Sequence, residues 1–153
     1  MAAHDRQGFE SGSEALDRYF RERITQDIRR RLATGFVAAS SDGDVAGFYT
    51  LAATSLQFDA LSVERSRKLP RYPVVPAILM GRLAVSLAHQ GNRLGSALVA
   101  DAFLRSGRSE IAAYAMVVNA KDERAARFYE HLGFERLPDA TLRLIRPLAG
   151  GGR

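Results

Sequence analysis

One segment constrains the fold more than any other part of this 153-residue chain: IAAYAMVVN, at Ile111–Asn119. Its residues are almost all apolar, without the alternation of a half-exposed strand. Such a run is typical of a strand that is covered on both faces. A strand of this kind lies within a sheet that has other layers against it. We therefore expect an α+β fold with a central mixed β-sheet flanked by helices.

The first half of the chain predicts a long helix followed by a hairpin. Apolar residues recur at three- and four-residue intervals from Leu16 to Leu32, which predicts one amphipathic helix over Ser13–Leu32, with Ser13 as its N-cap and Gly35 beyond its end. The further elements expected in this half are strands over 36–39 and 45–56 around a turn at 41–44, a short helix over 60–68, an extended proline-rich loop over 69–77, and a strand over 78–87.

The second half predicts two helices and two closing strands. A helix over 95–105 precedes the buried strand, and a helix over 122–132 follows it, with Asp122 as its cap and Gly133 as its left-handed C-terminal residue. The closing strands are expected over 134–136 and 141–147. The length suits a single domain over 1–153, with an ordered core of about 4–147 and a frayed tail over 148–153.

Composition excludes several classes of protein. The chain has no cysteine, which excludes disulfides, thiolate metal sites and cysteine nucleophiles. The histidines His4, His89 and His131 form no metal-binding spacing, so we expect no metal. No apolar run reaches the roughly 18–20 residues of a membrane helix, and the polar start at 1–10 is no secretory signal. The sequence therefore predicts a cytoplasmic protein that does not bind membranes.

The net charge is +5, from 22 Lys+Arg against 17 Asp+Glu, and almost every basic residue is arginine. Arginine suits phosphate geometry, so the charge favours an anionic partner such as RNA or a phosphorylated cofactor. The composition of an arginine-rich proteome explains the same excess equally well.

The chemical interest concentrates in RLAVSLAHQGNRLGSALVADAFLR, at 82–105. A buried strand runs into a loop with glycines at Gly91 and Gly95 and then into a helix start, where unpaired N–H groups and the helix dipole favour a phosphate. Arg93 can add a charge-assisted contact. A strand, a glycine turn and a helix also occur for structural reasons alone, and neither the Rossmann nor the P-loop pattern is present.

The loop resembles motif A of the GCN5-related N-acetyltransferases (GNAT), Gln/Arg-x-x-Gly-x-Gly/Ala, with Arg93 at the place of the first glycine. The resemblance implies a GNAT fold whose sheet splays at an acetyl-CoA site. The residues implied to bind acetyl-CoA from this segment are Leu83, Ala84, Val85, Gln90, Gly91, Asn92, Arg93, Leu94, Gly95 and Ser96.

The segment NAKDERAARFYEHLGF resembles motif B of the same family through Phe128, Tyr129, Gly133 and Phe134. Successive helical residues point about 100° apart, so we expect Phe128 to pack inward and Tyr129 to reach the cleft. Expulsion of a thiolate needs a proton donor, and a phenol can supply it, so Tyr129 is the candidate general acid; the alternative is a core tyrosine. Phe128 is a further candidate for the cofactor site. Asn119 either holds the pantetheine arm or caps the next helix.

The resemblance extends over about 4–147 to the GNAT toxins of bacterial toxin–antitoxin pairs, with the segments LPRYP and GRLAV as its distinctive parts. It implies a homodimeric toxin that acetylates the α-amino group of aminoacyl-tRNA and is neutralised by a ribbon-helix-helix antitoxin. The candidate tRNA contacts are Arg18, Arg21, Arg29 and Arg30. The same arginines suit a solvated helix face or the landing site of an acidic antitoxin.

Three other functions remain open at this point. The chain could acetylate a small amine or a protein amino group, since the two motifs do not specify the acceptor. It could be a non-catalytic module that binds acetyl-CoA, a reading that Arg93 keeps open. It could also bind RNA without any acetyl transfer, which strongly salt-dependent affinity would reveal.

Overall fold

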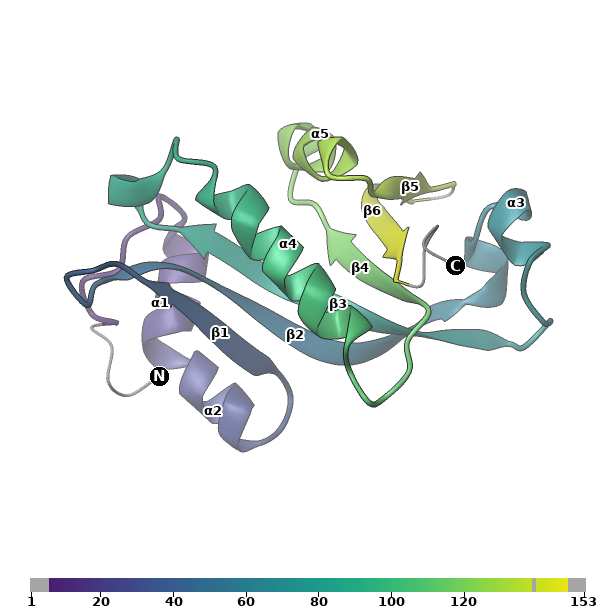
Figure 1. The fold of residues 1–153 in the computed structure, drawn as a ribbon, viewed down its shortest axis with the longest axis horizontal. Coiled ribbons are helices and arrows are strands. Elements are labelled where there is room, and N and C mark those ends of the chain that lie inside the picture. Colours follow the sequence, from purple (N-terminus) through teal and green to yellow (C-terminus); the bar gives the residue numbers. More distant parts are fainter. Residues whose placement is uncertain (1–5, 139, 149–153) are drawn as a thin grey trace. The chain divides into compact units, whose positions relative to one another are not determined.

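The computed structural model describes residues 6–138 and 140–148 (Figure 1). The α-helices are α1 (Glu14–Glu22), α2 (Ile24–Arg29), α3 (Val63–Ser66), α4 (Leu94–Gly107) and α5 (Glu123–His131), and two 3-10 helices are η1 (Phe58–Ala60) and η2 (Leu87–His89). The strands are β1 (Thr34–Ala39), β2 (Val45–Gln57), β3 (Val74–Val85), β4 (Ala115–Asn119), β5 (Glu135–Leu137) and β6 (Ala140–Pro147). Of the tail expected over 148–153, residues 149–153 lie outside the described residues, as do residues 4 and 5 of the expected core.

The strands form a mixed sheet in the order β1-β2-β3-β4-β6-β5. β3 and β4 are parallel, while β1–β2, β4–β6 and β5–β6 are antiparallel. The α+β fold with a central mixed sheet is therefore confirmed. The chain has two compact units, which are described separately: the first extends to Ala52 and includes Met80–Ala102, and the second comprises Ala53–Leu79 and the chain from Phe103 onward. The single domain over 1–153 stays a prediction.

The first unit has an aromatic core between α1 and β2. The rings of Phe20 and Phe48 stack with centroids 4.4 Å apart, and Phe9 packs on both of them. All three side chains are buried, as is Ile24 of α2. Because removing such a ring costs about 3–5 kcal/mol, this cluster firmly holds the N-terminal helices to the sheet. Ser13 caps α1 by accepting a hydrogen bond from the Leu16 N–H, as predicted.

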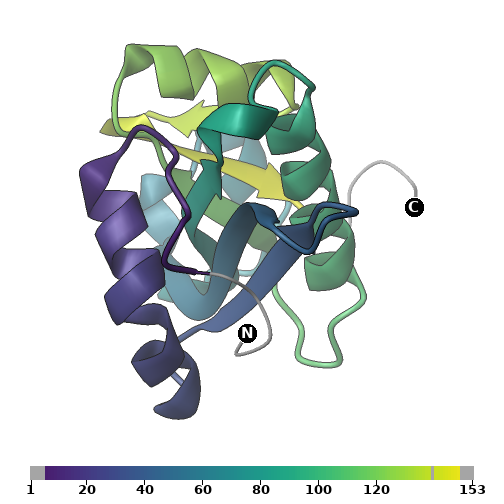
Figure 2. The same cartoon turned by 90° about the vertical axis from the view of Figure 1, so that its left-hand side faces the viewer.

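The opposite face of β2 carries α4. Gly47 is adjacent to Phe48 in the strand, so the two residues face opposite sides. A Cβ on Gly47 would lie 2.9 Å from both the Ala84 carbonyl oxygen and Leu98 Cδ1. Helix α4 therefore approaches the backbone of the sheet closely. Figure 2 shows α1 and α2 (purple) and α4 (teal) on opposite sides of the blue hairpin β1–β2.

The second unit has a core of small and branched residues from β3, β4 and β6, including Ala77, Ala115, Val117 and Ile145. Helix α5 is closed at both ends. The Asp122 side chain accepts from the Ala125 N–H, as predicted. At the other end, the Phe134 N–H donates to the Tyr129 carbonyl and the Gly133 N–H to that of Glu130, which is a Schellman motif. Gly133 has φ +92°, as its predicted left-handed role requires.

The single helix predicted over 13–32 is wrong. The chain forms α1 and α2 with a break at Arg23, whose φ is −120°. The spacing looks continuous because both helices bury the same face, at Phe20 and Ile24. Leu32, assigned to the buried face, is 62% exposed because α2 ends at Arg29 and Arg31 turns the chain with φ +61°.

Several strand and helix limits also differ. The buried strand is β4, Ala115–Asn119, and Ile111 is 79% exposed, since the start of the apolar run is a loop. Strand β3 begins at Val74, within the stretch predicted as a loop, and the Pro76 carbonyl accepts from the Tyr114 N–H. β3 ends at Val85 instead of at 87. The hairpin β1–β2 and the closing strands β5 and β6 agree with prediction to within one or two residues.

Within the described residues, no helix has the length and apolar character needed to cross a bilayer.

Candidate active site

The predicted cofactor loop lies in the first unit, between β3 and α4. Helix α4 begins at Leu94, and the first hydrogen bond within it runs from the Ala97 N–H to the Arg93 carbonyl, at 3.1 Å. The N–H groups of Leu94, Gly95 and Ser96 therefore precede that first bond. They combine with the helix dipole to favour a phosphate group at this end.

Two residues give the loop its path. Gly91 has φ +88°, and a Cβ placed there would meet no atom within 4 Å, so the backbone is open to a ligand. Arg93 has φ +60°, a left-handed conformation that glycine adopts readily and that costs other residues about 1–2 kcal/mol. Arginine thus occupies a backbone position suited to glycine, and its side chain is exposed.

The strand before the loop is ordered and largely covered. Ala84 is buried, and Leu83 and Val85 are half-buried. The Gln90 side chain turns away from the loop: its Nε2 donates to the Ser11 carbonyl at 2.8 Å and to the Val85 carbonyl at 3.0 Å. The next residues, Gly91 and Asn92, are exposed. The loop therefore offers backbone N–H groups and one guanidinium as the groups that fit a diphosphate.

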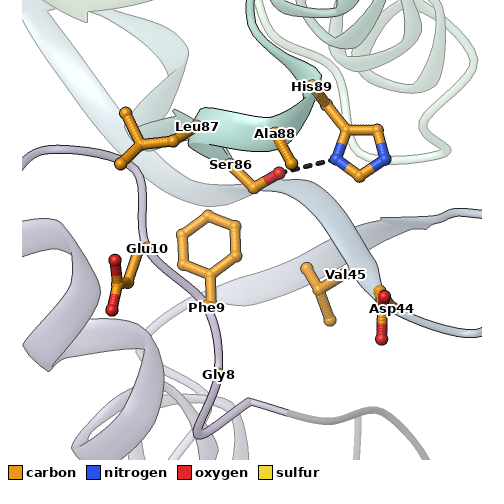
Figure 3. Close-up of a pocket in the computed structure, with 9 residues that line it drawn as sticks. All are labelled: Gly8, Phe9, Glu10, Asp44, Val45, Ser86, Leu87, Ala88 and His89. Atoms are coloured by element: carbon orange, nitrogen blue, oxygen red, sulfur yellow. Dashed lines mark hydrogen bonds between the residues drawn. The ribbon is translucent and has the colours of Figure 1, made fainter.

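A cavity of about 410 Å³ is lined in part by Ser86–His89, the segment that precedes Gln90. Figure 3 shows Phe9 between this segment and the start of β2, with the carboxylates of Glu10 and Asp44 on either side of the ring. The Ser86 hydroxyl is hydrogen-bonded to His89 Nδ1 at 2.6 Å in the same wall. This hydrogen bond holds the His89 side chain in the wall of the cavity. Within the described part of the chain, no group of three or more His, Asp or Glu side chains could hold a metal ion.

Tyr129 lies in the second unit, on the inner face of α5. It is 8% exposed, and its ring packs edge-on against Phe128 and Phe134, with centroids 5.1 and 5.6 Å away. Burial raises the pKa of its phenol to about 12, because the phenolate would lose its hydration. The phenol is therefore a proton donor throughout the physiological range. The expected orientation was partly wrong, since Tyr129 is buried more deeply than Phe128.

Asn119 is the exposed last residue of β4. It pairs in register with Arg143 of β6, so the two side chains lie on the same face. Arg143 has a buried Nε without a hydrogen-bond partner in the described structure. The sequence did not single out Arg143, because only the strand register places it beside Asn119. The Asp122 side chain caps α5, so Asn119 is not the cap of that helix.

Residues 32–136 match the family model described as an acetyltransferase (GNAT) domain. The chain belongs to the GNAT acetyltransferase family. It is an acetyl-CoA-dependent N-acetyltransferase, as the resemblance of its two motifs implied.

The relatives of this acetyltransferase include toxins. The tRNA-acetylating toxin of Mycobacterium tuberculosis is 37% identical over 145 residues, which cover 94% of this chain and 86% of the relative. The structure of AtaT complexed with acetyl-methionyl-tRNAfMet has a TM-score of 0.89 and 28% identity, covering 97% of this chain and 91% of that one. AtaTR bound with AcCoA gives 0.82 and 27%, covering 97% and 89%. The AtaT–AtaR complex bound to DNA gives 0.76 and 26%, covering 97% and 90%.

The four arginines predicted to contact tRNA have different surroundings in the acetyltransferase. Arg18 is exposed and pairs with Glu14 at 3.0 Å. Arg21 is half-buried and donates to the Phe9 carbonyl at 2.9 Å, so it helps to hold the N-terminal segment. Arg29 and Arg30 are exposed at the end of α2. The alternative of a solvated helix face therefore does not describe Arg21, and the tRNA contacts stay a prediction.

Arg93 provides a test of the cofactor loop. We expect Arg93→Gly to raise the melting temperature, because it relieves the left-handed strain of about 1–2 kcal/mol, and to weaken acetyl-CoA binding by about 3- to 10-fold, because a charge-assisted contact is lost. Thermal unfolding and calorimetry measure the two effects. Arg93→Lys keeps the charge, so its affinity for acetyl-CoA should lie between that of the unchanged protein and that of Arg93→Gly. Unchanged affinity of Arg93→Gly for acetyl-CoA would remove Arg93 from the binding site.

Proposed function

We propose that this acetyltransferase transfers the acetyl group of acetyl-CoA to the α-amino group of aminoacyl-tRNA and so blocks translation, as the toxin of a toxin–antitoxin pair. One observation carries the proposal: the likeness to a tRNA-acetylating toxin extends over nearly the whole chain, well beyond the acetyltransferase motifs. An N-acetylated aminoacyl end has no free amine to attack a peptidyl ester. A protein with this activity would therefore stop peptide elongation wherever the acetylated aminoacyl-tRNA is needed.

The residues of the chain have distinct roles in this reaction. The activated thioester is supplied by acetyl-CoA, whose diphosphate is held by the N–H groups that open α4 and by Arg93. We propose the backbone of Leu83–Val85 and the side chains of Asn119 and Phe128 as further contacts to acetyl-CoA. Tyr129 donates its phenolic proton to the departing sulfur, and its burial keeps that proton in place. The α-amine of an aminoacyl ester is less basic than lysine, so a water suffices as base.

The arginines beyond the cofactor loop are proposed to bind the tRNA backbone. Arg29 and Arg30 are exposed and suit contacts to phosphate, whereas Arg18 would first have to leave Glu14. Arg21 holds the Phe9 carbonyl and is proposed as a structural residue instead. We further propose that the protein is a cytoplasmic homodimer and that a ribbon-helix-helix antitoxin neutralises it. The complex formed by the relative AtaT with AtaR supports the antitoxin.

Cell-free translation tests this function. Purified protein should stop synthesis of a reporter only when acetyl-CoA is present, and adding fresh charged tRNA should restore synthesis for a time. Free CoA is the matched control and should leave translation unaffected. Translation that continues with acetyl-CoA present, while a small amine or a protein lysine becomes acetylated, would contradict the tRNA substrate. It would support acetylation of a small amine or a protein amino group instead.

A further inference from the structure

The backbone of Phe9–Ser11 is held by three different parts of the first unit. The Phe9 carbonyl accepts from Arg21 of α1 at 2.9 Å, and the Glu10 carbonyl from the Leu87 N–H at 2.7 Å. The Ser11 carbonyl accepts from Gln90 Nε2 at 2.8 Å. This short segment therefore connects the first helix to the beginning of the cofactor loop.

The same segment is anchored by a buried carboxylate. Asp17 of α1 is 6% exposed and accepts from the Ser11 N–H at 3.0 and 3.1 Å and from the Ser11 hydroxyl at 2.6 Å. A buried carboxylate is costly unless such donors surround it. Ser11 is therefore held on one side by Asp17 and on the other by Gln90.

Both N–H groups of the Gln90 side-chain amide donate hydrogen bonds to backbone carbonyls of the protein. Its two N–H groups bond to Ser11 and Val85, and because both partners are carbonyl oxygens, the nitrogen must face them. What remains is Oε1, an acceptor, which repels a phosphate. In this conformation the Gln90 side chain cannot donate to a diphosphate, although the motif places it in the cofactor loop.

The backbone before the loop is also held, since the Ser86 N–H donates to the Ala46 carbonyl and the Gln90 N–H to the Leu87 carbonyl. The loop itself is less covered. Gln90, Gly91, Asn92 and Arg93 are all exposed, and exposed backbone with few packed contacts opens easily. The cavity of about 410 Å³ is lined by both Gly8–Glu10 and Ser86–His89, so packing between these two segments is incomplete (Figure 3). The side-chain hydrogen bonds of Gln90 to Ser11 and Val85 therefore add to the order at the start of the loop.

We infer that Asp17, Ser11 and Gln90 form a relay that positions the acetyl-CoA loop, in which Gln90 is a positioning residue and not a ligand. The inference rests on the proposed binding of the diphosphate at the start of α4 but not on the identity of the acceptor. Loss of the relay lets the loop open, so the protein must spend binding energy on closing it. Acetyl-CoA affinity then falls, while kcat with saturating acetyl-CoA is retained.

Binding of acetyl-CoA by calorimetry, together with hydrogen exchange of the ligand-free protein over 91–97, tests the relay. Gln90→Glu places a carboxylate against two carbonyls, so we expect the Kd for acetyl-CoA to rise about 10-fold or more. Gln90→Arg keeps N–H donors, so it should retain most of the affinity of the unchanged protein for acetyl-CoA. Asp17→Asn, remote in sequence from the loop, should raise Kd about 3- to 10-fold. Both Gln90→Glu and Asp17→Asn should speed exchange in the loop.

The combination of variants decides between a relay and a direct ligand. The double variant Asp17→Asn/Gln90→Glu should bind about as weakly as Gln90→Glu alone, since both changes act through Ser11. Ser11→Ala is a milder variant that keeps the N–H bonds to Asp17 and should raise Kd about 2- to 5-fold. The control Glu14→Gln, on the exposed side of the same helix, should change neither Kd nor exchange.

Several results would overturn the relay. Additive effects on Kd, or loop exchange that is unchanged in Asp17→Asn and Ser11→Ala, would show that Gln90 acts independently of Ser11 and Asp17, and the relay would be wrong. If the unchanged protein bound no acetyl-CoA, the cofactor assignment itself would be wrong, and exchange in the ligand-free protein would still decide whether the relay orders the loop.

Discussion

Replacing Tyr129 with phenylalanine is expected to lower kcat by about 10²- to 10⁴-fold, the usual contribution of a positioned general acid. The change removes only the phenolic oxygen and leaves a ring that packs against Phe128 and Phe134. The affinity for acetyl-CoA and the melting temperature should therefore change little. Steady-state kinetics with charged tRNA, with calorimetry as the binding measurement, gives both values.

Tyr114→Phe is the matched control for Tyr129→Phe. Tyr114 is a tyrosine of the same unit that is half-buried where Tyr129 is buried, and burial raises the pKa of its phenol as well. Because no role in the reaction is proposed for it, its removal should leave kcat within about twofold of the original value. A kcat that falls equally in both variants, or in neither, would remove Tyr129 from its assigned role.

The pH dependence gives an independent measure of Tyr129. Its pKa of about 12 lies above the ordinary value of 10.0, so the phenol stays protonated as the pH rises from about 6 to 10. We expect kcat to rise with pH as the acceptor amine loses its proton and then to level off. A decline near pH 9 that disappears in Tyr129→Phe would show that the pKa of Tyr129 is not raised.

A single methyl group at Gly47 should damage both stability and cofactor binding. A Cβ at this position would come within 2.9 Å of the Ala84 carbonyl oxygen and of Leu98 Cδ1, so the backbone of β3 and the Leu98 side chain of α4 must both give way. We expect Gly47→Ala to lower the free energy of unfolding by about 1–3 kcal/mol, as overpacking does. Because α4 also supplies the N–H groups proposed to hold the diphosphate, acetyl-CoA affinity should fall as well.

Gly107→Ala separates this effect from the general effect of changing a glycine. Gly107 ends the same helix, and a Cβ there would meet no atom within 4 Å. Gly107→Ala should leave the free energy of unfolding unchanged or raise it by up to about 1 kcal/mol, and it should leave acetyl-CoA binding unchanged. Chemical denaturation and calorimetry measure both variants. If Gly47→Ala were as stable and bound as tightly as Gly107→Ala, the close approach of α4 to β2 would be wrong.

Local signals predicted the parts of the fold that depend on local geometry. Ser13 and Asp122 were identified as caps and Gly133 as a left-handed residue because each role is determined by a few neighbouring residues. The break at Arg23 was missed because periodicity records which face is buried and not whether the helix is continuous. Tertiary contacts stabilise that break: Tyr19 donates to Asp27 at 2.8 Å, and the Arg82 guanidinium lies 3.8 Å from the Tyr19 ring centroid.

The sequence predicted the loop and the helix start of the candidate site, but not the hydrogen bonds of its side chains. The glycine and helix-start pattern predicts where a phosphate would bind, and the left-handed φ of Arg93 shows that the arginine occupies a backbone conformation that favours glycine, at a cost of about 1–2 kcal/mol. The partners of Gln90 could not be predicted, because Ser11 lies 79 residues away and no local pattern connects them. For the same reason, the register that pairs Asn119 with Arg143 had no signal in the sequence.

The central claim, acetyl transfer to aminoacyl-tRNA, is tested most directly by mass measurement. A mixture of charged tRNAs is incubated with the protein and isotopically labelled acetyl-CoA, and the aminoacyl groups are then released and weighed. We predict that one or more aminoacyl groups gain the labelled acetyl group on the α-nitrogen, and that Tyr129→Phe largely abolishes the gain. If every aminoacyl group kept its original mass while the protein bound acetyl-CoA, the proposed function would be wrong.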